Sequence, residues 1–278
     1  MSREPYALCV DGKERIDLRK IDPADTAGVH KKRGLEELEE LGQEFSQLGN
    51  LLTYAGTHAL LVVLQGKDAS GKDGAIRKIL EVANIQNARV EPFKAPTDLE
   101  RAHDFLWRVH QVVPPRGHIA LFNRSHYEDV IAARVHELVP KDVWAARYEH
   151  INAFERLLVA SDVIVVKFCL HVSPKEQKER LLAREEDPRT AWKLNPNDWR
   201  ELSLYDELTA AYEDALEKCG TAEAPFYLVP SDKKWFRNLA VMQRLVMALR
   251  PHREAWLAHL KEIGKDAMKE IRALRDKV

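Results

Sequence analysis

The chain contains little cysteine and no long hydrophobic segment. Its 278 residues include only three cysteines, Cys9, Cys169 and Cys219, which are odd in number and far apart. Such a set forms neither a disulfide framework nor a zinc-binding spacing, and it fits a reducing compartment. No stretch approaches the ~18 apolar residues of a membrane span, and the N-terminus has no apolar core of signal-peptide length. We therefore expect a soluble, cytoplasmic protein that has no membrane partner.

The chain also lacks a charge excess of either sign. Its 43 lysines and arginines almost balance 44 aspartates and glutamates, so the net charge is −1. This balance argues against a protein that coats nucleic acid through bulk positive charge, and we expect no nucleic-acid partner. Hydrophobic residues make up 45% of the chain, which supplies a sizeable core and excludes wholesale disorder.

Short apolar runs alternate with helical patterns along most of the chain. The run at residues 58–65 is continuous and of strand length, which is typical of a buried strand in a parallel sheet. Further strands are expected at residues 88–93, 118–122, 162–172 and 226–229. Helices are expected at residues 34–53, 74–83, 98–112, 141–159, 174–186, 203–218, 234–249 and 253–275. This alternation predicts an α/β fold with a central parallel sheet that is covered by helices on both faces.

The same pattern divides the chain into three parts. Residues 1–33 are polar and aperiodic, and we expect them to form an N-terminal arm. Residues 34–250 should form the main domain, with a lid at about residues 174–200, and residues 251–278 should form a C-terminal helix. Because the arm and the terminal helix have apolar faces to bury, a homo-oligomer is the expected assembly.

The most specific motif is GKDASGKD at residues 66–73, which follows a predicted strand and leads into a predicted helix. Glycines permit tight turns, and successive N–H groups with the helix N-terminus form an anion-binding nest. Lys72 is placed to reach β- or γ-type phosphates. Asp73 stands where a serine or threonine normally offers a hydroxyl to magnesium. Together with Asp68, it favours a site in which Mg²⁺ lies between carboxylates and dense phosphate charge. The alternative is a chance glycine-rich turn.

A second polar cluster, NRSHYED at residues 123–129, follows the predicted strand 118–122. Ligands of doubly wound sheets bind beyond the carboxyl ends of the strands, so this turn should face the phosphate loop. Asp129 could reach a metal ion there, and Arg124 offers a planar fork to a phosphate. Arg134 lies five positions after Asp129, so the two residues match one helical face poorly. The alternatives are a helix-end role for Asp129 and a structural ion pair for Arg124.

The predicted lid carries basic residues. Arg180 and Arg184 lie four positions apart on one helical face, and Lys193 follows. In phosphoryl transfer, mobile cations that close over the transferring group stabilise its charge and exclude water. A solvated helix with mixed salt bridges is the alternative.

Four separated motifs together resemble the second family of polyphosphate kinases. They are residues 66–73, residues 123–129, the pair Trp192-Lys193 and residues 229–240, and the resemblance runs from about residue 30 to about residue 250. It implies a three-layer P-loop kinase fold like that of thymidylate kinases, with a central parallel sheet and a helical lid. It also implies transfer of the terminal phosphoryl group of inorganic polyphosphate to AMP and ADP, forming ADP and ATP, with the reverse reaction allowed.

The resemblance assigns roles to individual residues. Asp68, Lys72, Arg124 and Asp129 would be catalytic, and Asp68 and Asp129 would hold Mg²⁺, or Mn²⁺ in its place. Glu128 looks like the class III version of its position, which is associated with the use of both AMP and ADP. The remaining residues expected to contact polyphosphate or nucleotide phosphates are Gly66, Lys67, Ala69, Ser70, Gly71, Asp73, Arg134, Arg180, Arg184 and Lys193.

Two other functions remain open on sequence. An ATP-dependent nucleoside monophosphate kinase would share the core and the lid but would need no polyphosphate. A regulatory module could bind nucleotide without chemistry, although the several acidic positions around one phosphate loop speak against it.

Overall fold

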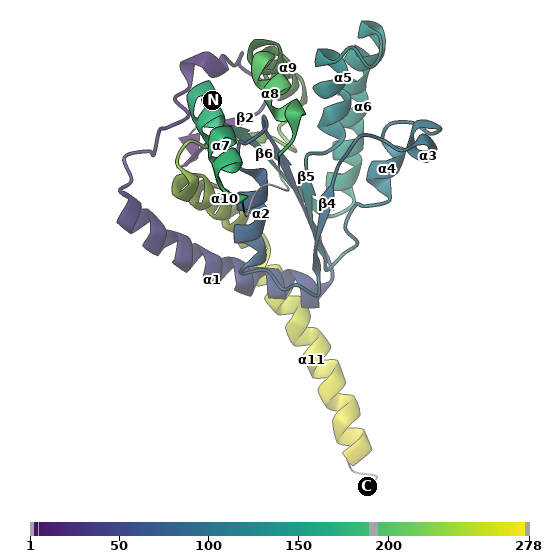
Figure 1. Ribbon diagram of the computed structural model, residues 1–278. Helices are drawn as coiled ribbons and strands as arrows, with labels where there is room; N and C mark the ends of the chain where they lie inside the picture. Colours follow the sequence, from purple (N-terminus) through teal and green to yellow (C-terminus); the bar gives the residue numbers. More distant parts are fainter. Residues whose placement is uncertain (1–2, 5, 189–193, 276–278) are drawn as a thin grey trace.

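Seven strands form one sheet at the centre of the chain, in the order β1-β2-β7-β6-β3-β5-β4 (Figure 1). The computed structural model describes residues 3–4, 6–188 and 194–275. The strands are β1 (Arg3–Glu4), β2 (Ala7–Val10), β3 (Ala59–Gln65), β4 (Ala88–Pro92), β5 (Ile119–Asn123), β6 (Val163–His171) and β7 (Phe226–Pro230). Strands β3 to β7 run parallel to one another, whereas β1 and β2 pair antiparallel with each other and β2 pairs antiparallel with β7. The five predicted strands are confirmed, and each observed strand end lies within one residue of the predicted end.

Helices cover both faces of this sheet, as the alternation of apolar runs predicts. The α-helices are α1 (Lys31–Ala55), α2 (Lys72–Leu80), α3 (Asp98–Arg101), α4 (Trp107–His110), α5 (Ala132–Val135), α6 (Lys141–Ala160), α7 (Pro174–Glu186), α8 (Pro196–Ser203), α9 (Tyr205–Cys219), α10 (Lys234–Leu249) and α11 (Arg253–Arg275). Short 3-10 helices are η1 (Leu18–Lys20), η2 (His126–Asp129) and η4 (Arg250–His252).

The central strand β3 divides the core into two layers. All seven of its residues are buried, and successive side chains point to opposite faces. Leu60, Val62 and Leu64 pack with the apolar faces of α1, α2 and α10. Leu61 and Val63 pack with those of α6 and α9. Strand β3 also pairs with β5 in parallel, so the carboxyl ends of these two strands lie next to each other. Both loops of the predicted site start there.

The N-terminal segment differs from the expected polar arm. Residues of β2 pair with β7, with Leu8 opposite Leu228, and extend the sheet on one side. Val10, Ile16 and Leu18 are buried in the core. The physical reason is that β7 would otherwise present an open edge of unpaired N–H and C=O groups.

The segment 98–112 also differs, because the single helix expected there is broken into α3 and α4. The side chain of Asp104 accepts a hydrogen bond from the N–H of Leu106, at 2.9 Å. This local turn competes with a continuous helical ladder and starts a new helical turn instead.

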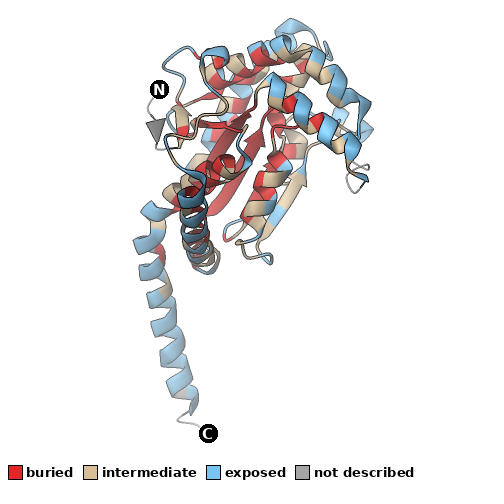
Figure 2. Cartoon of the chain, turned by 60° about the vertical axis from the view of Figure 1, so that its left-hand side comes forward, coloured by how far each residue is buried: buried red, intermediate tan, exposed pale blue. Residues whose placement is uncertain are grey.

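The last helix, α11, leaves the body of the molecule and projects away from the sheet (Figure 1). Trp256 is buried at its base, and every described side chain from Lys261 onward is exposed (Figure 2). Among the described residues, no helix is both long and apolar enough to cross a membrane.

Candidate active site

The phosphate loop folds with a backbone that most residues avoid. Gly66 and Gly71 have φ values of 147° and 105°, and Ala69 adopts a left-handed φ of 57°. The N–H of Ser70 donates to the carbonyl of Lys67 at 3.1 Å, which closes a tight turn. The buried Ser70 hydroxyl has no hydrogen-bond partner within the described part of the chain. A strained turn with an unsatisfied buried donor is the arrangement expected of a preformed anion site.

Two arginines from distant elements hold this loop in place. The guanidinium of Arg180 on α7 donates to the carbonyls of Ala69 and Ser70 at 2.8 and 3.1 Å and to those of residues 231 and 232. Arg237 on α10 is buried against the helix start, so that a Cβ at Gly71 or Gly74 would overlap its guanidinium. Burial lowers the pKa of Arg237 to about 10. Gly71 therefore serves close packing as well as the turn, and Gly74, directly after the motif, serves close packing.

The two lysines of the loop are buried and bound to neutral groups. Lys72 donates to the carbonyls of Gly66 and Lys67 at 2.7 and 3.2 Å. Lys67 donates to the hydroxyl of Thr209 at 2.6 Å and lies 3.4 Å from the centre of the Tyr205 ring. Burial lowers the pKa of each lysine to about 8, and for Lys72 the charge of Arg124 acts in the same direction. Because neither ammonium forms an ion pair with a described carboxylate, both charges are available to an anionic ligand.

Arg124 joins the phosphate loop to the second cluster. It has a left-handed φ of 62°, and its guanidinium binds Asp68 and Glu128, the latter at 3.1 Å. The two carboxylates keep its pKa above the ordinary value against the effect of burial. The structure thus brings Asp68 and Glu128 to either side of one guanidinium, at the ends of β3 and β5.

Asp129 lies on η2 between two further arginines. Its Oδ2 is 3.2 Å from Nη2 of Arg108, and its Oδ1 is 3.6 Å from Nη1 of Arg147. Burial raises the pKa of this carboxyl above its ordinary value, and the two arginines oppose that shift. Asp73 is placed differently, because its Oδ1 accepts from the amide of Asn123 at 2.8 Å.

A buried network supports η2 from below. The ammonium of Lys167 on β6 donates to Glu155 at 2.6 Å, to the hydroxyl of Tyr127 at 2.9 Å and to the carbonyl of Cys219 at 2.7 Å. Glu155 also accepts from the Tyr127 hydroxyl at 2.7 Å and lies 3.3 Å from His126. Since residues 126 and 127 directly precede Glu128 and Asp129, this network holds the turn that carries both carboxylates.

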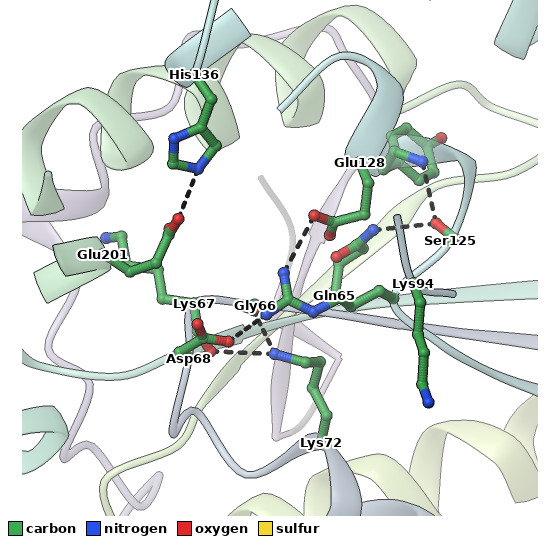
Figure 3. Close-up of polar contacts among 12 residues, drawn as sticks. Gln65, Gly66, Lys67, Asp68, Lys72, Lys94, Ser125, Glu128, His136 and Glu201 are labelled. Atoms are coloured by element: carbon green, nitrogen blue, oxygen red, sulfur yellow. Dashed lines mark hydrogen bonds and ion pairs between the residues drawn. The ribbon is translucent and has the colours of Figure 1, made fainter. Parts of the chain in front are cut away.

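One cavity of about 980 Å³ collects most of these groups. Of the predicted site residues, those that line it are Gly66, Lys67, Asp68, Arg124, Glu128 and Asp129. Helix α8, which lies in the segment predicted as a lid, lines one side, where Asp198 and Glu201 face the cavity. Glu201 bridges to His136 at the end of α5, at 2.6 Å (Figure 3).

Other predicted site residues lie outside this cavity. Lys72, Ser70 and Gly71 lie within the loop itself, and Arg180 uses its donors on the loop carbonyls and on Glu176. Arg184 pairs with Asp198 at 2.7 Å, and Arg134 pairs with Asp214 on α9. Lys193 and its neighbour Trp192 lie outside the described residues.

Several residues of the site carried no sequence signal. Arg108 and Arg147 stand in segments without a motif, and their positions beside Asp129 depend on the packing of α4 and α6. Glu201 and His136 are likewise joined only by tertiary structure. Arg237 lies within the fourth motif, residues 229–240, and only its burial beneath the loop shows its place.

Comparisons with known proteins agree on one family. The family described as Polyphosphate kinase 2 (PPK2) matches residues 28–255. An AMP/ADP-polyphosphate phosphotransferase from Meiothermus ruber is 44% identical over 246 residues, 88% of this chain and 91% of that protein. An ADP-polyphosphate phosphotransferase from Rhodopseudomonas palustris is 39% identical over 246 residues, and the match covers 83% of this chain and 84% of that protein. The crystal structure of polyphosphate kinase 2 from Arthrobacter aurescens TC1 superposes with a TM-score of 0.83 at 35% identity, over 90% of this chain and 92% of that one.

Proposed function

The chain belongs to the polyphosphate kinase 2 family, and from this premise we propose that it transfers the terminal phosphoryl group of inorganic polyphosphate to AMP and to ADP. The products are ADP and ATP. The relative from Meiothermus ruber, whose name includes both acceptors, matches over most of its length. The fold is that of P-loop kinases, as its likeness to the structure from Arthrobacter aurescens TC1 shows.

The observation that carries this proposal is the single cavity between the phosphate loop and η2. Gly66, Lys67 and Asp68 lie on one wall of it, and Glu128 and Asp129 lie on another. A polyanionic donor can bind to the loop amides and lysines while the acceptor phosphate binds near η2. Such an arrangement supports direct transfer between the two reactants.

The chain's own residues act by positioning and by neutralising charge. Lys72 and the loop N–H groups are suited to hold the donor end, because the Lys72 ammonium is buried at the loop and bound to backbone carbonyls, with no ion pair to a described carboxylate. Arg124 lies between the loop and η2, where its fork can contact the transferring phosphoryl group. No covalent intermediate on the protein is needed for this transfer.

Asp68 and Asp129 fit a magnesium ion that arrives with the phosphates. Both carboxylates line the cavity and offer hard oxygen donors. The described residues contain no group of three or more histidine, cysteine or acidic side chains that could hold an ion alone. Mg²⁺ in phosphoryl-transfer sites is usually bound by one or two carboxylates, by water and by substrate phosphates, so this donor set suits it. Mn²⁺ prefers similar ligands. When bound, the ion screens the negative charge of the two reactants.

Glu128 is the residue that we connect with acceptor choice. It binds Arg124 at 3.1 Å and faces the cavity from η2. A carboxylate at this position can draw a metal ion or the arginine toward a shorter acceptor, which supports the use of AMP as well as ADP.

The decisive experiment follows ATP formation by luminescence from Mg²⁺, polyphosphate and either AMP or ADP. We expect ATP from both acceptors, none without polyphosphate or metal, and none with Lys72→Ala. Asp129→Asn should lose about 100-fold in rate, since it removes one charged group from the reacting centre. Asp142→Asn on the exposed surface of α6 is the matched control and should keep its rate.

Two outcomes would contradict the proposal. If Asp129→Asn kept full activity at saturating Mg²⁺, the assigned role of this carboxylate would be wrong. If ATP phosphorylated AMP while polyphosphate did not, the chain would be an ordinary monophosphate kinase.

We also propose that the protein works in the cytoplasm as a homo-oligomer. The cysteines support the location, because Cys169 and Cys219 are buried thiols that form no disulfide within the described residues. The exposed apolar residues of α11 support the assembly.

A further inference from the structure

The distal part of α11 stands in solvent and packs against no other described element of the chain. Trp256 is buried at the base of the helix and Leu260 is half-buried, but every described side chain beyond it is exposed. Figure 2 shows this part as a continuous exposed rod that leaves the body. A helix of this length gains little stability in water on its own, because most helical stability comes from packing of an apolar face.

That rod nevertheless carries an apolar seam. Residues that recur at alternating spacings of three and four are Leu257, Leu260, Gly264, Ala267, Ile271 and Leu274. This is the repeat of a two-helix coiled coil. Ile271 and Leu274 are 44% and 62% exposed, and the neighbouring Ile263 and Met268 are 48% and 44% exposed. No atom of the described residues lies within 4 Å of the position that a Cβ at Gly264 would take. The seam is thus complete in sequence and uncovered within the described chain.

The charges beside this seam are separated by sign. At 3.6 residues per turn, Lys261, Arg272 and Arg275 lie along one edge of the seam, and Asp266 and Glu270 lie along the other. Within the chain, Lys265 pairs with Glu262 and Lys269 pairs with Asp266 on or toward the outer face. Glu270 and Arg275, by contrast, form no ion pair with any described residue.

We propose that α11 pairs with α11 of a second copy of this chain, with the two helices running in the same direction. Helices that run in the same direction bring the basic edge of each against the acidic edge of the other. Helices that run in opposite directions bring like edges together. In the first arrangement Glu270 faces Arg275 of the second copy, five positions along, and the contact occurs twice by symmetry.

This pairing specifies the homo-oligomer proposed above and does not depend on the proposed reaction. The helix projects from the end of the molecule opposite the lid helices α7 and α8 (Figure 1). Paired α11 helices therefore leave the cavity of each copy open, and changes on α11 should alter assembly without altering the rate per chain.

The test measures molar mass against concentration by light scattering and sedimentation, with the full-length chain. Glu270→Lys and Arg275→Glu each replace two attractive contacts by two repulsive ones, and each should raise the dissociation constant about tenfold. A one-to-one mixture of the two variants should restore the affinity, because Lys at 270 then faces Glu at 275 on the second copy. Lys269→Glu, on the outer face, is the matched control and should leave the affinity unchanged.

Four outcomes would overturn the proposal. The first is a wild-type chain that stays monomeric throughout. The second is Ile271→Asp protein that assembles like the wild type. The third is a mixture that stays as weak as its two components, which would refute pairing in the same direction. The last is a monomeric chain that binds vesicles of anionic lipid through α11, which would assign the seam to a membrane surface. Polyphosphate-dependent ATP formation, measured alongside, separates failure of this inference from failure of the proposed reaction.

Discussion

The buried ammonium of Lys167 offers the sharpest test of how the active-site turn is held. Lys167→Met keeps the length and apolar body of the side chain but removes the charge. Lys167 is fully buried and Glu155 is 1% exposed, and their charged atoms lie 2.6 Å apart. The change leaves a carboxylate in the core without its cation, while the contacts of Glu155 with His126 and Tyr127 remain.

The expected cost follows from this uncompensated charge. Removing one partner of a buried ion pair typically lowers the free energy of unfolding by about 3–5 kcal/mol. In the native protein burial raises the pKa of Glu155, but Lys167 and His126 outweigh burial and bring it below the ordinary value. Without Lys167, burial dominates and the pKa of Glu155 in the folded state lies above that of the unfolded chain. The loss in the free energy of unfolding is then complete above the raised pKa of Glu155, and it shrinks as the pH falls through that pKa.

Urea unfolding at several pH values measures this effect, with the double variant Lys167→Met/Glu155→Gln as the control. The double variant should recover most of the lost stability, since an uncharged pair carries no such desolvation cost. The same samples should show a raised Mg²⁺ requirement for ATP formation in the single variant, because η2 carries Asp129. A loss below about 1 kcal/mol, with no change in the pH dependence, would refute the reasoning.

Three further predictions concern backbone, thiols and pH. Gly71→Ala should lower the melting temperature more than Gly28→Ala, because both residues have positive φ but only the first would place a Cβ against another group; equal losses would contradict the packing argument. Burial raises the pKa of Cys169 and of Cys219 to about 12, so a thiol reagent at pH 8 should modify them only after unfolding, as mass spectrometry would show, and rapid labelling of the native protein would contradict this. Burial and a neighbouring histidine lower the pKa of His252 below 6.5, so the unfolded chain binds the proton first and stability should fall as the pH drops below about 6.5. His252→Gln should flatten that slope in thermal melts, and an unchanged slope would assign the pH dependence to other groups.

The sequence predicted most of the fold because its apolar runs are long and regular. The strands β3 and β6 are buried on both faces, so their residues read as continuous apolar segments. Residues 7–10 gave no such signal, because four residues in a polar segment are too short to show a period. Their burial depends on the edge of β7, which lies more than 200 residues further along the chain.

The candidate site was predicted only where a local motif carried it. The phosphate loop and η2 follow strand ends, so the expected meeting of the two loops is found. Arg124, which was expected to contact a phosphate, joins them by binding Asp68 and Glu128, as the alternative of an ion pair had it. Arg180 was expected to face a ligand, whereas it donates to two carbonyls of the phosphate loop. The sequence could not show this contact, because the position of a backbone carbonyl leaves no trace in the spacing of side chains. The arginines beside Asp129 come from packing between elements, which local sequence does not encode.

The pairing of β2 with β7 has a consequence for how the chain is made. A ribosome synthesises β2 more than 200 residues before β7, beside which β2 lies in the sheet. Until β7 is made, β2 can pair only with the two-residue strand β1, and the sheet closes only after a long loop has been brought together, which slows folding. During synthesis, the nascent chain therefore carries an unfinished sheet until β7 has been made, and chaperones that shield exposed strand edges should meet it over that interval.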